Sequence, residues 1–183
     1  MSKESIKEIG SRLKMAEDAE REQLMKVYAS DDRAGVQKLL EKYRKQKEKL
    51  LAEKERLAKM RQYEEKYADY AFICGIDEVG RGPLAGPVVA GAVILPKECE
   101  ILYINDSKKL SAAKRDELYD EIMDKAVAVG LGMASPARID EINILQATYE
   151  AMRKAVEQLS VVPDLLLNLS LIHISEPTRL QLI

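Results

Sequence analysis

Two adjacent carboxylates, Asp77 and Glu78, directly precede a turn rich in glycine and proline that also contains one arginine, Arg81. Two like charges side by side are costly unless a cation is shared between them or water screens them. A hard divalent metal ion bound by carboxylate oxygens would remove that cost and supply a reason for the arrangement. The glycines of the turn would let backbone N–H groups approach a substrate closely. The pattern suggests a metal site beside a substrate-binding turn.

Nucleotide-binding loops fit the spacing of this segment less well. A dinucleotide-binding loop needs G-x-G-x-x-G opening a helix, whereas Gly80, Gly82 and Gly86 are spaced differently and precede an apolar run. A phosphate-binding P-loop needs Gly-Lys-Ser/Thr, which this sequence does not contain. A tight turn with a solvated acidic pair has the same composition, because Asp, Gly and Pro are ordinary turn residues. Composition alone favours that simple turn.

The wider motif resembles a known enzyme family. Residues 77–90, DEVGRGPLAGPVVA, are similar to the opening motif of ribonuclease HII. Further matches follow in the order of that family: DSKKLS at 106–111, IDEINILQAT at 139–148 and PDLLL at 163–167. The resemblance covers about residues 71–167. Arg81 between the two glycines distinguishes this motif from that of the related ribonuclease HIII.

The resemblance implies an endonuclease that cuts the RNA strand of RNA–DNA hybrids, or DNA containing ribonucleotides, and leaves 5′-phosphate and 3′-hydroxyl ends. Asp77 and Glu78 would be the catalytic residues and metal ligands, with Mn²⁺ or Mg²⁺ as the cofactor. The main chain of Gly80, Arg81 and Gly82 would recognise the ribonucleotide, including its 2′-hydroxyl, which distinguishes RNA from DNA.

Four further residues match family positions near the substrate. Lys108 and Lys109 would lie near substrate phosphates, although exposed lysines are otherwise usually just solvated. Asn143 and Thr148 would lie near the substrate backbone. Helix capping by Asn143 and packing of Thr148 explain the same residues equally well.

Length and composition bound the class of protein. The chain has 183 residues, a net charge of -2, two cysteines without close spacing and no apolar run near 18 residues. We therefore expect a cytoplasmic monomer without a membrane segment, a disulfide framework or a zinc site. Residues 38–61 contain ten basic and four acidic side chains. This excess would suit a phosphate backbone, and a solvated helix gives the same composition.

The elements around the acidic pair follow a mixed α/β order. Apolar runs predict strands at 71–76 and 88–95, expected to be an antiparallel pair joined by the glycine-rich turn. The remaining predicted elements are strands at 101–104 and 126–133, helices at 111–125, 135–141 and 144–159, and a last strand beginning at Asp164. This order agrees with the ribonuclease H-like fold that the resemblance implies, a mixed sheet with flanking helices, here incomplete.

Three segments are expected along the chain. Residues 1–70 form a charged helical extension similar to the one that ribonucleases HII of the Firmicutes often have. Within it Val36, Leu39, Leu40, Tyr43 and Leu50 form an apolar stripe. Residues 71–168 correspond to the N-terminal part of a catalytic domain, and residues 169–183 to a non-native tail.

The tail is inferred because the match ends after Leu167 and one back-translation of residues 169–179 resembles a transposon-type sequencing adaptor. The third metal-binding aspartate of the family would fall at Leu169, and the fourth carboxylate has no counterpart. His173, the one histidine, is discounted as part of this tail. We therefore expect the chain itself to be inactive. The alternatives are a non-catalytic nucleic-acid-binding fragment and a charged-helix interaction protein.

Overall fold

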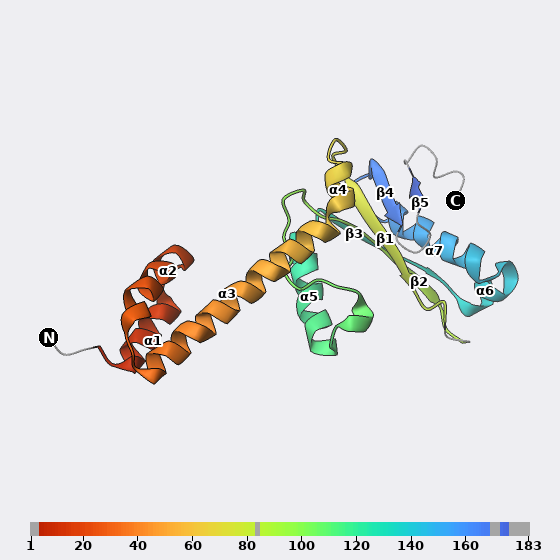
Figure 1. Cartoon of the computed structure of the whole chain (residues 1–183). Coiled ribbons are helices and arrows are strands. Elements are labelled where there is room, and N and C mark those ends of the chain that lie inside the picture. The colour runs from red at the N-terminus through yellow and green to blue at the C-terminus, as the bar shows by residue number, and fades with distance from the viewer. Residues whose placement is uncertain (1–3, 83–84, 169–172, 176–183) are drawn as a thin grey trace. The chain divides into compact units, whose positions relative to one another are not determined.

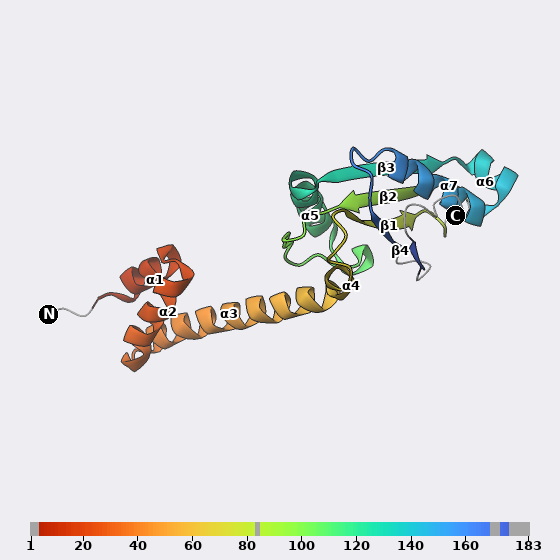
Figure 2. The same cartoon turned by 90° about the horizontal axis from the view of Figure 1, so that it is seen from above.

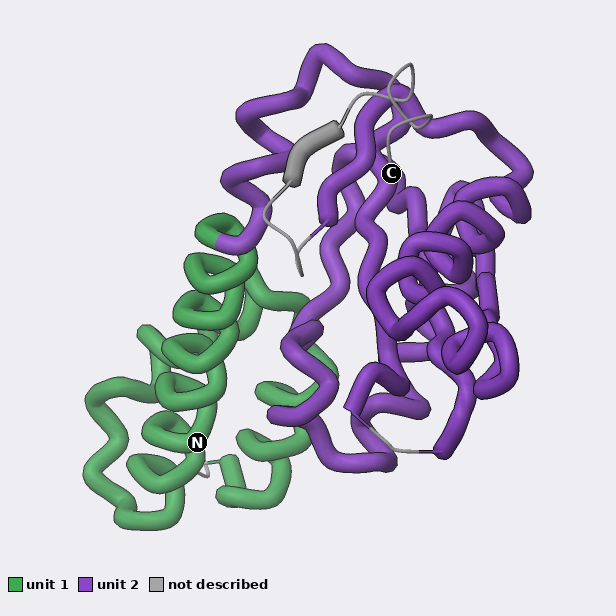
Figure 3. Tube along the Cα trace, turned by 90° about the vertical axis from the view of Figure 1, so that its right-hand side faces the viewer, with its two compact units in different colours: residues 1–59 green, residues 60–183 purple. Residues whose placement is uncertain are grey.

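The chain divides into two compact units, residues 1–59 and 60–183, each with its own hydrophobic core (Figure 3). This computed structural model describes residues 4–82, 85–168 and 173–175. The expected segments 1–70, 71–168 and 169–183 remain predictions, and most of the last segment lies outside the described residues.

The first unit consists of helices α1 (Ile6–Met15) and α2 (Asp18–Val27), the 3₁₀ helix η1 (Tyr28–Ser30) and most of the long helix α3 (Ala34–Met60) (Figure 1). Ser5 begins α1 with a capping box, in which its hydroxyl accepts from the Glu8 backbone N–H and the Glu8 carboxylate accepts from the Ser5 N–H. The core of the unit comprises Ile9, Leu13, Ala16, Leu24, Tyr28, Val36 and Leu40. The apolar stripe predicted on α3 therefore packs within this unit at Val36 and Leu40.

The second unit contains the short helix α4 (Gln62–Lys66) and a five-stranded mixed sheet (Figures 1 and 2). Its strands are β1 (Ile73–Val79), β2 (Val88–Ile94), β3 (Ala128–Ala134), β4 (Leu165–Asn168) and β5 (His173–Ser175). The spatial order is β3-β2-β1-β4-β5. β1 is antiparallel to β2 and parallel to β4, while β2 pairs with β3 and β4 with β5 in antiparallel fashion. The predicted mixed sheet and its antiparallel β1–β2 pair are confirmed.

The helices of this unit are η2 (Ser107–Lys109), α5 (Ala112–Lys125), α6 (Pro136–Ile142) and α7 (Ile144–Glu157). α7 packs against β1, β2 and β3. Its alanines at 147, 151 and 155 are fully buried and let the helix lie very close to the sheet. A Cβ on Gly132 would stand 1.9 Å from the Ala151 carbonyl oxygen, so this contact requires glycine. Among the described residues, no helix is long and apolar enough to cross a membrane.

The start of β1 is tied to the start of β4 by a side chain from much later in the sequence. The Asp164 carboxylate accepts hydrogen bonds from the backbone N–H groups of Ala71 and Phe72, at 3.0 and 2.9 Å. From there Ile73 pairs with Leu165 and Ile76 with Asn168. Asp164 therefore has a structural role in its motif, which is to hold the start of β4 beside the start of β1.

The predicted strand at 101–104 is wrong. Leu102 and Tyr103 form a turn, and Tyr103 has a φ of 68°, which an extended strand cannot contain. Ile101 is nevertheless only 4% exposed. Its apolar character therefore reflects burial of a loop residue rather than a place in the sheet.

Candidate active site

Asp77 and Glu78 lie within β1, and not after it as the sequence suggested. Their register with β2 is regular, because Asp77 pairs with Gly91, Glu78 with Ala90 and Val79 with Val89. The strand thus continues three residues beyond the predicted end at Ile76, without a bulge among these pairs. Successive side chains of a strand point to opposite faces. Glu78 therefore shares the face of the buried residues Cys74 and Ile76, while Asp77 is exposed on the other face.

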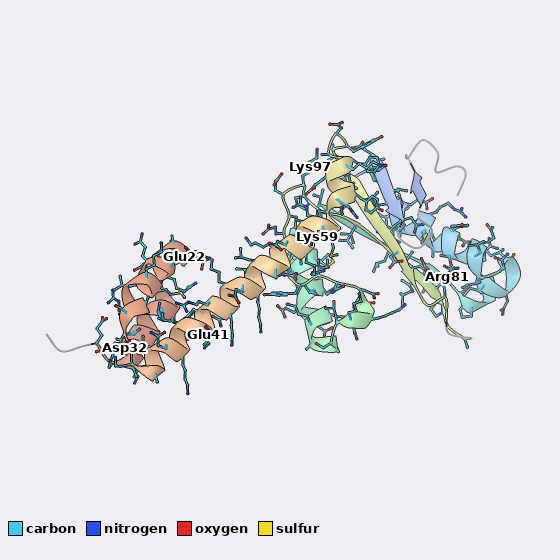
Figure 4. The ribbon with its side chains drawn as sticks, viewed as in Figure 1. Glu22, Asp32, Glu41, Lys59, Arg81 and Lys97 are labelled. Carbon is cyan, nitrogen blue, oxygen red and sulfur yellow. The ribbon has the colours of Figure 1, made fainter. Side chains whose placement is uncertain are left out.

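The Glu78 side chain is 9% exposed, and only one of its two carboxylate oxygens has a hydrogen-bond partner among the described residues. Its Oε1 accepts from Arg81 Nη1 at 3.1 Å, whereas Oε2 is buried and has no hydrogen-bond partner among the described residues. A buried carboxylate oxygen without a partner costs free energy, so its position calls for a cation or a donor. Arg81 itself is 38% exposed and lies near the end of β1 (Figure 4).

Asp77 is held differently. Its Oδ1 accepts from the backbone N–H of Glu78 at 2.9 Å, and its side chain is exposed to solvent. The two adjacent carboxylates therefore present one solvated group and one buried group at the same point of the central strand. Cys74 lies four residues before Glu78, on the same face of β1. It is fully buried, and this burial raises the pKa of its thiol to about 11. That cysteine is a core residue of the sheet.

The turn after β1 begins with a glycine that its geometry requires. Gly80 has a φ of 99°, and a Cβ there would stand 2.4 Å from the Pro87 carbonyl oxygen. Gly82 has no such constraint, since a Cβ would meet nothing within 4 Å. Gly80 is thus explained by the turn itself, whereas packing gives no reason for glycine at position 82.

Lys108 and Lys109 both lie in η2 and are exposed. Asp106 begins this 3₁₀ helix, and its carboxylate accepts from the backbone N–H of Lys108 at 2.9 Å. The motif therefore has a local structural function that presents two cationic side chains to solvent. Exposed ammonium groups in this position are compatible with a phosphate partner.

Asn143 and Thr148 have structural functions at the start of α7. Asn143 has a φ of 70°, and its side-chain oxygen accepts from the backbone N–H groups of Leu145 and Gln146. Thr148 is 2% exposed, and its hydroxyl donates to the Ile144 carbonyl at 2.7 Å. Capping and packing thus account for both residues, and their contact with a substrate stays a prediction. Among the predicted site residues, the structure pairs the side chains of Glu78 and Arg81, whereas the Asp77 side chain is exposed on the opposite face of β1.

The acidic pair fits a hard cation in one respect. Glu78 Oε2 is a buried carboxylate oxygen without a hydrogen-bond partner in the part of the chain that the structure describes, and Mg²⁺ and Mn²⁺ prefer such oxygen ligands. Asp77 would supply a second carboxylate from the opposite face of β1. The part of the chain that the structure describes contains no cluster of three or more His, Cys, Asp or Glu that would complete such a site. Position 169, where the resemblance predicts a third metal-binding aspartate and the chain has Leu169, lies outside the described residues.

The pairing of Arg81 with Glu78 was not anticipated from the sequence. The sequence nevertheless contained a signal for this ion pair, because Glu78 and Arg81 have opposite charges and are three residues apart. The family resemblance assigns the main chain of Arg81 to substrate recognition, and the structure pairs its side chain with a carboxylate of its own motif.

Comparison with known proteins identifies the class. The family model described as "Ribonuclease HII N-terminal domain" matches residues 5–68, and the model described as "Ribonuclease HII" matches residues 74–181. The chain is 68% identical over 141 residues to "Ribonuclease HII" of Lachnoclostridium phytofermentans, covering 77% of this chain and 56% of that protein. It is 51% identical over 169 residues to "Ribonuclease HII" of Bacillus cytotoxicus, covering 91% and 65%.

A mixed α/β unit with an acidic pair on its central strand thus matches a ribonuclease family model. The chain belongs to the ribonuclease HII family. It spans between 56% and 65% of the length of the two relatives named above. Among solved structures, the ribonuclease H2 of Pyrococcus horikoshii OT3 matches 60% of this chain and 54% of its own, at 25% identity and a TM-score of 0.47.

Proposed function

We propose that the whole protein to which this chain belongs is an endonuclease that hydrolyses the RNA strand of RNA–DNA hybrids, or DNA at embedded ribonucleotides, in the cytoplasm and as a monomer. Membership of the ribonuclease HII family supports the reaction. The observation that supports the site is Oε2 of Glu78, which is buried and has no hydrogen-bond partner among the described residues, next in sequence to the exposed carboxylate of Asp77.

Asp77 and Glu78 would hold Mn²⁺ or Mg²⁺. When bound, such an ion makes water a stronger nucleophile and stabilises charge on the leaving oxygen. The chain's own contribution is to fix the two carboxylates on a paired central strand, where β2 and β4 flank β1. A site on a rigid strand keeps its ligands in place at little entropic cost during the reaction.

The turn that follows would recognise the ribonucleotide. Gly80 turns the chain sharply after β1, and Gly82 leaves its backbone uncovered by a side chain. Main-chain groups at Gly80, Arg81 and Gly82 could thereby approach a 2′-hydroxyl, the group that separates RNA from DNA. Lys108 and Lys109 on η2 would contact phosphates, as would Arg81 when it is not engaged by Glu78.

The test is a cleavage and binding assay with an end-labelled hybrid in Mg²⁺ or Mn²⁺. In the protein made from the intact gene, Asp77→Asn and Glu78→Gln should each lower turnover at least 100-fold, about 2.7 kcal/mol of transition-state stabilisation. Hybrid affinity should change little. Asp120→Asn on α5 is the matched control and should retain turnover. Unchanged turnover in both site variants would exclude the acidic pair from the reaction.

A second candidate function is nucleic-acid binding without cleavage. One face of α3 presents the side chains of Lys38, Glu41, Lys42, Lys45, Gln46 and Lys49. Among these described residues, only Lys45 and Glu41 form an ion pair, at 3.3 Å. A row of cations suits a phosphate backbone. Hybrid binding by the 183-residue chain without strand scission would favour this function. If the chain neither binds nor cleaves the hybrid, the result would favour a helical interaction protein.

A further inference from the structure

The ion pair between Arg81 and Glu78 has an internal counterpart that shows what it lacks. Glu53 and Arg56 on α3 have the same i, i+3 spacing, and the Glu53 side chain is also 9% exposed. There the guanidinium reaches both carboxylate oxygens, from Nε to Oε2 at 2.8 Å and from Nη2 to Oε1 at 2.7 Å. Such two-point pairing is the strong geometry for arginine and carboxylate.

Arg81 makes only half of that contact. It reaches Oε1 of Glu78 through Nη1 alone, at 3.1 Å, and leaves Oε2 buried and unpartnered among the described residues. The guanidinium is 38% exposed, so it can return to solvent at modest cost. Glu78 is therefore paired weakly with Arg81 through Oε1, and among the described residues its Oε2 has no partner that a second cation would have to replace.

We propose that Arg81 is a displaceable counter-ion, which pairs with Glu78 until a divalent cation takes over that carboxylate. This inference rests on the proposed metal site and adds a regulatory element to it. The cation and the guanidinium compete for one anionic group, because the two positive charges repel each other within a few ångströms. Once released, the exposed guanidinium is available to a phosphate of the nucleic acid.

The competition predicts that removing the arginine charge tightens metal binding. Mn²⁺ is titrated into the full 183-residue chain, and free Mn²⁺ is measured by electron paramagnetic resonance. Arg81→Gln should lower the apparent dissociation constant about tenfold, since a neighbouring charge typically changes ionic equilibria by one to three powers of ten. Arg81→Lys keeps the charge and should stay within about twofold of the wild type.

Two controls separate this effect from a general change of charge. Lys114→Gln removes one positive charge from an i, i+3 pair with the exposed Glu117 and should leave Mn²⁺ affinity unchanged. Glu78→Gln should weaken Mn²⁺ binding, and adding Arg81→Gln to it should give no further gain. The coupling between positions 78 and 81 then measures the competition directly.

Thermal unfolding provides a second readout that needs neither substrate nor turnover. Without metal, Arg81→Gln should unfold at a lower temperature than the wild type, because it leaves a buried carboxylate with no cation. Added Mn²⁺ should raise the midpoint of this variant more than that of the wild type. Equal Mn²⁺ affinity in the wild type and Arg81→Gln, weaker binding in the variant, or no Mn²⁺ binding by any variant would each overturn the proposal. Absence of hybrid cleavage by the protein made from the intact gene, with the predicted Mn²⁺ affinities observed, would instead count against the proposed function.

Discussion

At the scale of single residues, the two glycines around Arg81 differ in what a side chain would meet. Gly80→Ala places a Cβ 2.4 Å from the Pro87 carbonyl oxygen at a φ of 99°, and we expect a decrease of about 1–3 kcal/mol in the free energy of unfolding. Gly82→Ala meets nothing within 4 Å and should change stability by less than about 0.5 kcal/mol. If the backbone at position 82 approaches the ribonucleotide, Gly82→Ala should still weaken hybrid binding. Urea unfolding measures the stability of both variants, and a binding titration measures their affinity for the hybrid. Equal stabilities of the two variants would contradict the structural requirement for glycine at position 80.

At the scale of elements, one carboxylate on α7 connects α6 and β3. Glu150 pairs with Lys154 and Arg138, each at 2.8 Å, and Lys154 also donates to the Met133 carbonyl of β3. Hydrogen bonds from Lys154 and then Arg138 hold the pKa of Glu150 at about 2, below its ordinary 4.5. A depressed folded-state pKa stabilises the fold above about pH 4.5, and that contribution disappears as the pH falls toward 2.

Glu150→Gln should therefore lower the thermal midpoint at pH 7, and its difference from the wild type should shrink between pH 4.5 and 2. Glu157→Gln, on the same helix, is the control and should show a small difference throughout. Scanning calorimetry at several pH values provides the measurement. A gap between Glu150→Gln and the wild type that is constant down to pH 2 would refute the network's effect on stability.

At the scale of the whole molecule, the two units are expected to contribute different terms to hybrid binding. The lysine face of α3 belongs to residues 1–59, whereas the acidic pair belongs to residues 60–183 (Figure 3). Replacing Lys38, Lys42 and Lys49 by Gln should reduce the salt dependence of hybrid affinity, by up to about 0.9 in log–log slope for each phosphate that is no longer neutralised. Turnover at saturating hybrid should not change, because these lysines would supply affinity while the acidic pair supplies the chemistry.

The matched control for that prediction removes the same charge from α1 and α2 of the same unit. Lys7, Lys14 and Lys26 are exposed there, and their triple replacement by Gln should leave the salt slope as it is in the wild type. Affinity measured by fluorescence anisotropy between low and moderate salt gives both slopes. Identical slopes for all three proteins would show that the α3 lysines are only solvated surface.

Local sequence determined the elements whose patterns are short-range. The strand at 88–95, the glycine-rich turn before it and the helix at 135–141 were all predicted from neighbouring residues, and the strand and the helix correspond to β2 and α6. The acidic motif also identified the family before any geometry was available, because its residue types and spacing are specific. The predicted strand at 101–104 was wrong, because the burial of Ile101 depends on contacts that a local pattern cannot encode.

Only the tertiary structure decided how the acidic pair is presented. β1 extends to Val79 because β2 supplies partners through Val89, so Asp77 and Glu78 fall on opposite faces. The parallel partner β4 comes from much later in the chain and is held at its start by Asp164. Packing of the sheet against α7 buries the face to which Glu78 belongs. This burial leaves Oε2 of Glu78 without a partner among the described residues, and only Oε1 contacts Arg81. The energy of a charge depends on what surrounds it in space.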